Sequence, residues 1–304
     1  YNGDGKIVLT YASTEGPWNN PRGNGGIRLL NIADDSITDI TPEKNGYGDV
    51  VIDPANPDRM VAVTENVYDQ QANGTFGDDF YVTTDGGKTW KNINLDMTMS
   101  GGDVSWHNES SMHWCSSLAI DPHNTGKIMV VSGNGIFSCD NIWDEHPAFY
   151  FFAEGIEETV PYELVSIPGG ELVTVVGDYD GFTQEDAAER HSSNAGSMTG
   201  LAVAAANTDV WVKAANSDTG NDFWYSEDRG VTWSNKVTAP VSGQNGHGGS
   251  VAISADGSTF YWAPDNMAFV FWSDDKGKTW NQSEGGMSAK RLIADPVNPD
   301  YLYA

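Results

Sequence analysis

Ser273-Asp274-Asp275-Lys276-Gly277-Lys278-Thr279-Trp280 is the stretch that decides the fold. It places a hydroxyl residue, Asp, Gly and Thr at alternate positions and ends with Trp, and the same pattern recurs at 83–90 and 226–233. Each copy follows an aromatic or β-branched run. In a hairpin turn the Asp can accept backbone N–H bonds, the Gly can adopt a positive φ, and the Trp can pack under the hairpin. The three copies predict β-hairpins whose aspartates form turns rather than carry out chemistry.

A second repeat consists of a short apolar strand followed by an Asp-Pro turn. It occurs at 50–58, 118–124 and 292–300, with a degenerate Asp-Gly copy at 251–257. Together with the first pattern, known as the Asp-box, it predicts an all-β fold made of β-propeller blades, each a four-stranded antiparallel sheet. We expect the inner strands of six blades, and of the start of a seventh, near residues 6, 49, 117, 163, 200, 250 and 291.

Two long inserts interrupt this repeat, at 96–112 and 181–197. The first has no clear strand pattern, and it is either a linker between two propellers or a loop over one face. In the second, only 184–191 has a trace of helical periodicity, and we interpret it as a loop insertion. Because propeller loops at one end of the blades carry the sites, both inserts are candidates for the walls of a cleft.

The composition restricts the partners that this chain can bind. Its 304 residues include 16 Lys and Arg against 43 Asp and Glu, a formal net charge of −27. That charge repels nucleic acids and anionic membranes, so we expect neither as a partner. A neutral polysaccharide is not repelled, and 11 Trp, 12 Tyr and 11 Phe offer faces for sugar rings. No run approaches the ~20 apolar residues of a membrane span. The acidity favours solubility in an extracellular or salty medium.

The cysteines and histidines indicate no metal site. Cys115 and Cys139 are too few for a zinc site, and they form either one disulfide or two buried thiols. The six histidines lack metal-ligand spacing, and no calcium-binding Asp-x-Asp-x-Asp-Gly loop is present. We therefore expect no cofactor and no histidine or cysteine metal site, and bound Ca²⁺ in an acidic loop stays an open alternative.

One carboxylate is placed where chemistry could occur. Asp178, in the stretch 175–182, ends an apolar strand, follows a Gly, and precedes aromatic residues and a polar insertion. A carboxylate at a strand end can reach substrate as a general acid or base, and the alternative is an ordinary turn Asp. Glu157 and Glu158 are a second candidate pair, with the alternative that they are charges on an edge strand that prevent aggregation.

Several further motifs follow one another in a fixed order along the chain. They are Gly46-Tyr47, 53–57, the Asp-box that ends at Trp90, 114–124, 155–159, 177–182 and 215–220. This ordered series resembles the middle of a glycoside hydrolase family 74 xyloglucanase. The series spans nearly the whole chain, and it is much more specific than the Asp-box alone.

The resemblance implies an endo-acting β-glucanase made of two seven-bladed propellers with an open cleft between them. It implies hydrolysis with inversion by two aspartates, one from each propeller, and Asp178 matches the second, the expected general base. The Asp-x-Gly-Gly-Ala-Tyr segment that carries the other is not found in this sequence. We expect 1–105 to be the last blades of a first propeller and 106–304 the first blades of a second.

The expected partner is a plant cell-wall polysaccharide, xyloglucan or a related β-1,4-glucan, bound by a secreted, monomeric protein. Aromatic rings in the predicted loops are the candidate sugar platforms. They are Tyr179, Phe182, Trp106, Trp114, Trp143 and Trp18. Each loop Trp is either a subsite or a packing residue, whereas the three Asp-box tryptophans are expected in the core.

Two other functions fit an Asp-box propeller. A sialidase needs a cluster of arginines to hold a carboxylate, and the chain has six, three of them in or beside the repeat turns. The second alternative is a non-catalytic propeller that recognises a glycan or a protein, and the missing acid favours it. The chain also begins without Met and ends inside an expected strand, which predicts a piece of a longer protein.

Overall fold

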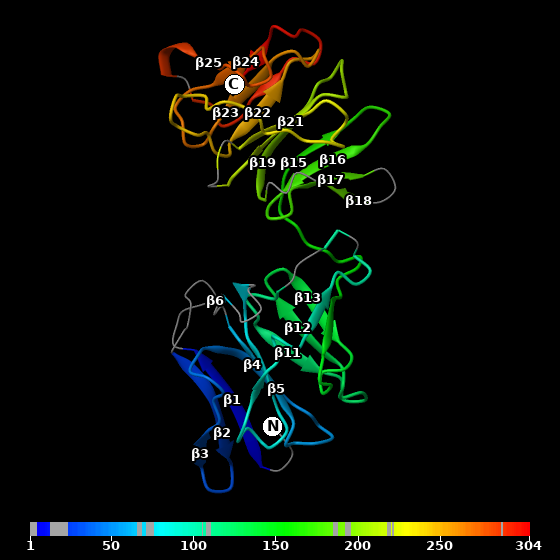
Figure 1. Cartoon of the computed structure of the whole chain (residues 1–304), viewed down its shortest axis with the longest axis vertical. Coiled ribbons are helices and arrows are strands. Elements are labelled where there is room, and N and C mark those ends of the chain that lie inside the picture. The colour runs from blue at the N-terminus through cyan, green and yellow to red at the C-terminus, as the bar shows by residue number, and fades with distance from the viewer. Residues whose placement is uncertain are drawn as a thin grey trace. The chain divides into compact units, whose positions relative to one another are not determined.

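The regular secondary structure of the computed structural model is almost entirely β-strand, and the chain divides into two units, Tyr1–Glu158 and Thr159–Ala304 (Figure 1). It describes residues 5–12, 24–65, 69–70, 76–104, 106–107, 111–184, 188–191, 196–217, 220, 222–286 and 288–304. Within these residues no helix is long and apolar enough to cross a membrane.

The first unit contains three blade-like sheets and one short hairpin. The first sheet is β1 (Lys6–Ala12), β2 (Gly25–Asn31) and β3 (Ser36–Asp39). The second is β4 (Tyr47–Ile52), β5 (Met60–Thr64), β8 (Phe80–Thr83) and β9 (Lys91–Asn92). The third is β11 (Ser117–Ile120), β12 (Ile128–Ser132), β13 (Gly135–Cys139), β14 (Ala148–Phe151) and β10 (Thr98–Ser100). The hairpin is β6 (Asp69–Gln70) and β7 (Phe76–Gly77).

The second unit contains three more sheets and the beginning of a fourth. The first sheet is β15 (Pro161–Ser166), β16 (Leu172–Val176), β17 (Gly181–Gln184) and β18 (Ala188–Arg190). The second is β19 (Met198–Val203), β20 (Trp211–Ala215) and β21 (Phe223–Ser226). The third is β22 (Ser250–Ile253), β23 (Phe260–Ala263), β24 (Phe271–Ser273) and β25 (Asn281–Gln282), followed by a 3₁₀ turn, Glu284–Gly286. The last pair is β26 (Ile293–Ala294) and β27 (Leu302–Tyr303).

These sheets confirm the predicted blades. Each expected inner strand lies at or next to the first strand of a sheet, namely β1, β4, β11, β15, β19, β22 and β26. Successive strands within a sheet are antiparallel neighbours, with β10 as the one parallel addition among the described strands. The prediction succeeded because each apolar run is closed by a local turn signal.

The two units meet after Glu158, and the predicted boundary after residue 105 lies inside the first unit. β10 lies in the first insert and pairs in parallel with β14 of the third sheet, Thr98 opposite Ala148. The first insert therefore contributes a strand instead of forming only a linker or loop. The assignment of the two parts to a first and a second propeller stays a prediction.

The second insert is also built differently from the prediction. Its residues 181–184 and 188–190 are β17 and β18, the outer strands of a blade, in place of a loop with a helical turn. The pairing of Phe182 with Thr174 and with Arg190 extends the sheet outward from β16. This hydrogen-bonding pattern outweighs the weak helical periodicity because an added strand satisfies the backbone donors of β16.

The Asp-boxes form the predicted turns. In the last box, Asp275 Oδ1 accepts a hydrogen bond from the Ser273 hydroxyl at 2.8 Å and from Thr279 N–H at 2.8 Å. Gly277 has a φ of 76°, and a Cβ there would lie 2.4 Å from Val237 Cγ1, so only Gly fits. Asp85 and Asp228 accept equivalent bonds in the other two boxes.

The Asp-box tryptophans are half-buried and pack against the hydrophobic cores of their units. Trp90 Nε1 donates to Ile40 O at 2.7 Å, and Trp280 Nε1 donates to Thr238 O at 3.0 Å. Trp233 packs beside Trp211, with ring centroids 6.3 Å apart. The Asp-Pro turns are closed in the same local way, because Asp53 and Asp295 accept backbone N–H bonds from the residues two positions later.

The box carboxylates predict a pH effect on stability. Hydrogen bonds from the Thr279 backbone and side chain lower the pKa of Asp275 to about 2. A carboxylate with a lowered folded-state pKa stabilises the fold above its unfolded pKa and loses that contribution as pH falls through the folded value. We expect the Tm difference between the wild type and Asp275→Asn to be complete above about pH 5, to fall between pH 5 and pH 2, and to disappear below about pH 2. A difference that stays constant over this range in calorimetry would contradict this role.

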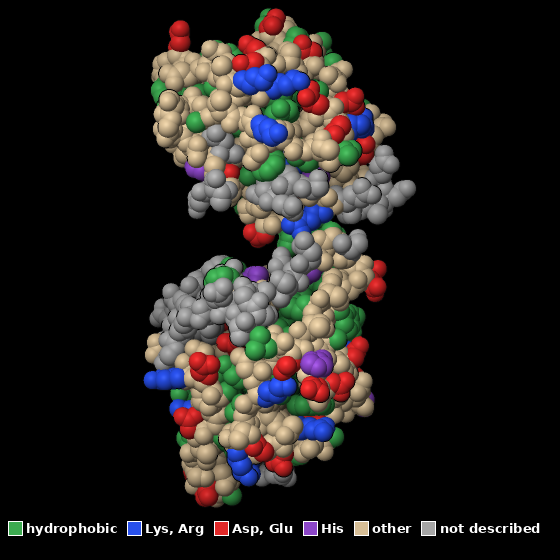
Figure 2. Space-filling model, in the orientation of Figure 1, with side chains coloured by type: hydrophobic (Ala, Val, Ile, Leu, Met, Phe, Trp, Pro, Cys, Tyr) green, Lys and Arg blue, Asp and Glu red, His purple; other side chains and the backbone are tan. Residues whose placement is uncertain are grey.

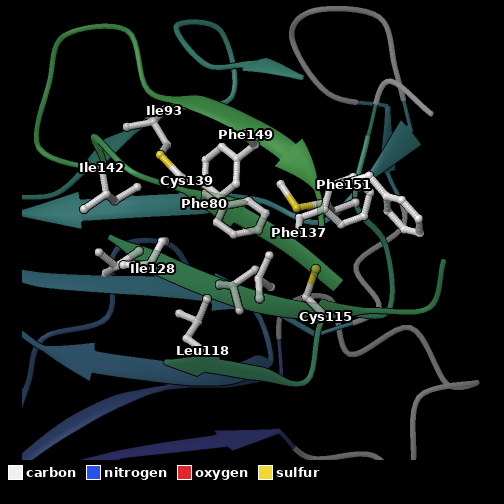
Figure 3. Close-up of a cluster of buried hydrophobic side chains, with 14 of the residues drawn as sticks. Phe80, Ile93, Cys115, Leu118, Ile128, Phe137, Cys139, Ile142, Phe149 and Phe151 are labelled. Atoms are coloured by element: carbon white, nitrogen blue, oxygen red, sulfur yellow. The ribbon is translucent and has the colours of Figure 1, made fainter. Parts of the chain in front are cut away.

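The largest buried cluster lies in the first unit and joins the second and third sheets (Figure 3). The Phe80 ring of β8 lies 5.5 Å from that of Phe149 on β14, and Phe137 of β13 lies in the same cluster. Cys115 and Cys139 are also buried in it as free thiols, which decides between the two alternatives that the sequence left open. Burial raises the pKa of both thiols, so neither is poised to react.

Candidate functional site

The turn between β16 and β17 carries the predicted catalytic residue, Asp178. Gly177 follows β16 directly, and both Asp178 and Asp180 have positive φ, 66° and 70°. Asp tolerates this conformation better than most residues, but a non-Gly residue there is still uncommon. Two hydrogen bonds close the turn, from Tyr179 N–H to Gly177 O at 2.7 Å and from Val176 N–H to Asp180 O at 3.0 Å.

Asp178 presents its carboxylate to solvent in a fixed direction. The side chain is exposed, and its own N–H donates to Ser197 Oγ at 2.9 Å. The Ser197 hydroxyl donates in return to Asp178 Oδ1 at 3.0 Å. No other described residue forms a hydrogen bond with this carboxylate, so Oδ2 is available to accept a proton from a water molecule.

Asp180, two residues along, is turned the other way and is fully buried. Its carboxylate forms an ion pair with the ammonium of Lys213, which lies on β20 and is also fully buried. Lys213 Nζ lies 3.3 Å from His191 Nδ1 and 3.8 Å from the centre of the Trp233 ring. The other imidazole nitrogen, His191 Nε2, is 3.1 Å from Thr183 Oγ1.

Burial and charge assign the protonation states in this cluster. Burial, with Lys213 nearby, lowers the pKa of His191 to about 3, so this imidazole is neutral at pH 7. Burial also lowers the pKa of Lys213, to about 8, although the Asp180 carboxylate acts in the opposite direction. With Nδ1 accepting from Lys213, the proton of His191 is on Nε2, which donates to Thr183. The cluster thus contains one neutralised pair of charges and a neutral imidazole.

The structure buries the two predicted platform residues that flank this turn. Tyr179 is 8% exposed and Phe182 is 7% exposed. Arg190 Nε donates to the Tyr179 carbonyl at 3.0 Å, and the guanidinium carbon of Arg190 lies 5.3 Å from the centre of the Tyr179 ring. Neither ring therefore presents an open face to a sugar. Adjacency to Asp178 in the sequence does not reveal this, because Asp178 is exposed whereas Tyr179, the next residue, is buried.

The other predicted platforms belong to the first unit. Trp106, Trp114 and Trp143 are each half-buried. Trp143 Nε1 donates to Thr125 O at 2.6 Å, and the Trp106 ring lies 6.4 Å from the Phe151 ring. Their roles as subsites stay predictions, and Trp18 lies outside the described residues.

Glu157 and Glu158 are exposed and lie outside any strand, in the segment that ends the first unit. They are therefore not edge-strand charges. More generally, acidic side chains are scattered over the visible face of each unit rather than gathered in one patch (Figure 2).

A second acidic position, Asp222, was missed in the sequence analysis. It precedes β21 as Asp180 precedes β17, and its carboxylate is 3% exposed. Asp222 Oδ1 accepts from the Ser217 hydroxyl at 2.5 Å, and Oδ2 lies 2.8 Å from His247 Nδ1. The serine bonds the carboxylate and not the imidazole, so this is not the geometry of a nucleophilic triad. The available signal was the motif at 215–220, which ends two residues before Asp222.

The described residues offer neither a metal site nor an arginine cluster. No group of three or more His, Cys, Asp or Glu side chains in this part of the chain is arranged to hold a metal ion. The described arginines come from different sheets and turns, and each has a protein partner. These pairs are Arg28 with Asp39, Arg59 with Asp53, Arg190 with Tyr179, Arg229 with Glu171, and Arg291 with Glu163. This arrangement gives no support to the sialidase alternative.

Comparison with known proteins finds an Asp-box repeat in this chain and similarity to xyloglucanases. The BNR/Asp-box repeat matches residues 81–92. The chain is 28% identical to a xyloglucanase from Paenibacillus sp, over 99% of this chain and 32% of that protein. It is 23% identical to an oligoxyloglucan-reducing end-specific xyloglucanase from Emericella nidulans, over 99% of this chain and 47% of that one.

Among solved structures, the GH74 enzyme of Niastella koreensis is similar with a TM-score of 0.84 and 32% identity, over 99% of this chain and 44% of that one. These matches confirm the resemblance to glycoside hydrolase family 74 and the propeller fold. The chain spans about a third to a half of the length of the relatives that it matches.

Proposed function

We propose that this chain is part of a secreted glycoside hydrolase that cleaves xyloglucan or a related β-1,4-glucan, and that Asp178 is its general base. The observation that carries the proposal is the exposed Asp178 carboxylate, fixed by Ser197 on a turn with positive φ. The similarity to xyloglucanases along 99% of the chain supplies the substrate class.

The mechanism is hydrolysis with inversion. Asp178 Oδ2 removes a proton from a water molecule as that water attacks the anomeric carbon, while a second carboxyl group protonates the leaving oxygen. The two carboxyl groups must stand roughly 6.5 to 9.5 Å apart so that the water fits between substrate and base. The acid belongs to the Asp-x-Gly-Gly-Ala-Tyr segment that the resemblance implies, and that pattern is not found in this sequence.

The test uses the full-length protein and soluble xyloglucan. We expect new reducing ends, a fast fall in viscosity that reports internal cleavage, and the α-anomer as the first product in proton NMR, because inversion of a β-linkage yields α. The β-anomer as first product would contradict an inverting mechanism.

A non-catalytic glycan-binding propeller is the second candidate, because only one of the two expected aspartates is in this sequence. Binding of xyloglucan in calorimetry without any new reducing ends would favour it over the hydrolase.

A further inference from the structure

We propose that Lys213 is a positioning residue for Asp178: its buried ion pair with Asp180 holds the turn that aims the Asp178 carboxylate. The inference rests on the proposed role of Asp178 as general base. It assigns a function to a charged pair that touches no solvent and takes no direct part in the proposed chemistry.

The first step of the argument is the conformation of the turn. Asp178 and Asp180 both occupy the left-handed region within the five residues from 177 to 181. Non-Gly residues in this region are strained, and they persist only where the surroundings enforce them. Two of them in one turn require anchors outside the turn itself.

The anchors on the backbone come from the segment that leads into β19. Asp180 N–H donates to Gly196 O at 3.0 Å, and Ser197 both accepts from Asp178 N–H and donates to its carboxylate. Ser197 O in turn accepts from Asn216 N–H at 2.8 Å, just after β20. These contacts fix one side of the turn to the neighbouring sheet.

The side-chain anchor is the ion pair. Asp180 immediately precedes β17, and Lys213 lies on β20, the middle described strand of the next sheet. Because β15 and β16 contact β19, the two sheets are neighbours, and the pair links adjacent blades. Both side chains are fully buried. Because His191 and the Trp233 ring hold the ammonium from other sides, Lys213 has one defined position to which Asp180 is fixed.

Catalysis depends on the position and orientation of the Asp178 carboxylate. Asp180 is separated from Asp178 by one residue, so a change in the Asp180 backbone rotates the carboxylate of Asp178. A displacement of about 1 Å in a reacting group can lower a rate by about 10²-fold. Loss of the anchor should therefore reduce kcat far more than it changes substrate binding.

The experiment uses the full-length protein with xyloglucan as substrate. We expect Lys213→Met to lower kcat by about 10- to 100-fold while KM changes less than about threefold. Amide hydrogen exchange at 177–181 should become faster. In an Asp178→Asn background the same substitution should lower kcat little further, because both changes then act on one group.

Two further variants separate positioning from stability. Val212 is the buried neighbour of Lys213 on β20, but it packs in the cluster of Phe223, whereas the Trp233 ring beside Lys213 packs in the cluster of Trp211. Val212→Ala should therefore lower Tm without lowering kcat. The double variant Lys213→Met with Asp180→Asn removes both buried charges and should recover much of the lost Tm, since an unpaired buried charge is what destabilises the single variant. Its kcat should stay low.

Recovery of kcat together with Tm in the double variant, or unchanged exchange at 177–181 in Lys213→Met, would overturn the inference. Full activity of Asp178→Asn would instead overturn the proposed function, and the exchange measurement would still decide whether Lys213 holds the turn.

Discussion

Replacing Asp178 by Asn in the full-length protein is expected to lower kcat for xyloglucan hydrolysis by about 10²- to 10⁴-fold, the usual contribution of a general base. The amide can still accept a hydrogen bond from Ser197, and Asn tolerates a positive φ, so the turn should keep its conformation. Only the capacity to take a proton is lost. The measurement is the initial rate of release of reducing ends, with Tm as the check on folding.

A matched control exists in the first unit. Asp35 is also exposed and also has a positive φ, 56°, but it lies in the turn between β2 and β3. Asp35→Asn makes the same chemical change in the same backbone conformation and should leave kcat unchanged. If the two variants have equal activity, Asp178 is an ordinary turn residue and the base must be sought elsewhere.

The features of this fold that sequence reasoning predicted are those with local causes. In each Asp-box the carboxylate bonds residues two and four positions away, as Asp85 does with Thr83 and Thr89. Such turns are encoded within about eight residues, so a pattern read along the chain is sufficient. The inner strands were found for the same reason, because an Asp-Pro or Asp-Gly turn follows many of them directly.

The features that were missed depend on contacts between distant residues. Asp180 pairs with a lysine 33 positions away, and Asp222 pairs with a histidine 25 positions away. No periodicity links such residues, since their proximity results from the stacking of one sheet beside the next. The burial of Tyr179 and Phe182 has the same origin, because it is decided by what packs against β17 and its turn.

The predicted boundary after residue 105 comes from the family resemblance and lies inside the first unit, and a substitution of Phe80 would test it. Phe80 is fully buried and lies between the second and third sheets of the first unit, with its ring 5.5 Å from that of Phe149 (Figure 3). Phe80→Ala leaves a cavity in the shared cluster and should reduce the free energy of unfolding by about 3–5 kcal/mol. Denaturant unfolding measures this loss.

The strands in which Phe80→Ala speeds hydrogen exchange distinguish a boundary after residue 105 from one after Glu158. If the first unit extends to residue 158 as one cooperative body, Phe80→Ala should also speed hydrogen exchange in β12 and β13, which lie beyond residue 105 and share the cluster. A division after residue 105 predicts faster exchange in β4, β5 and β8 alone. Phe152→Ala is the control, because this ring is 46% exposed at the end of β14, and its loss should cost about 0.5 kcal/mol or less. Faster exchange in β12 and β13 of Phe80→Ala would show that the blades on either side of residue 105 unfold as one cooperative body. The first insert would then join these two blades, in agreement with the pairing of its strand β10 with β14.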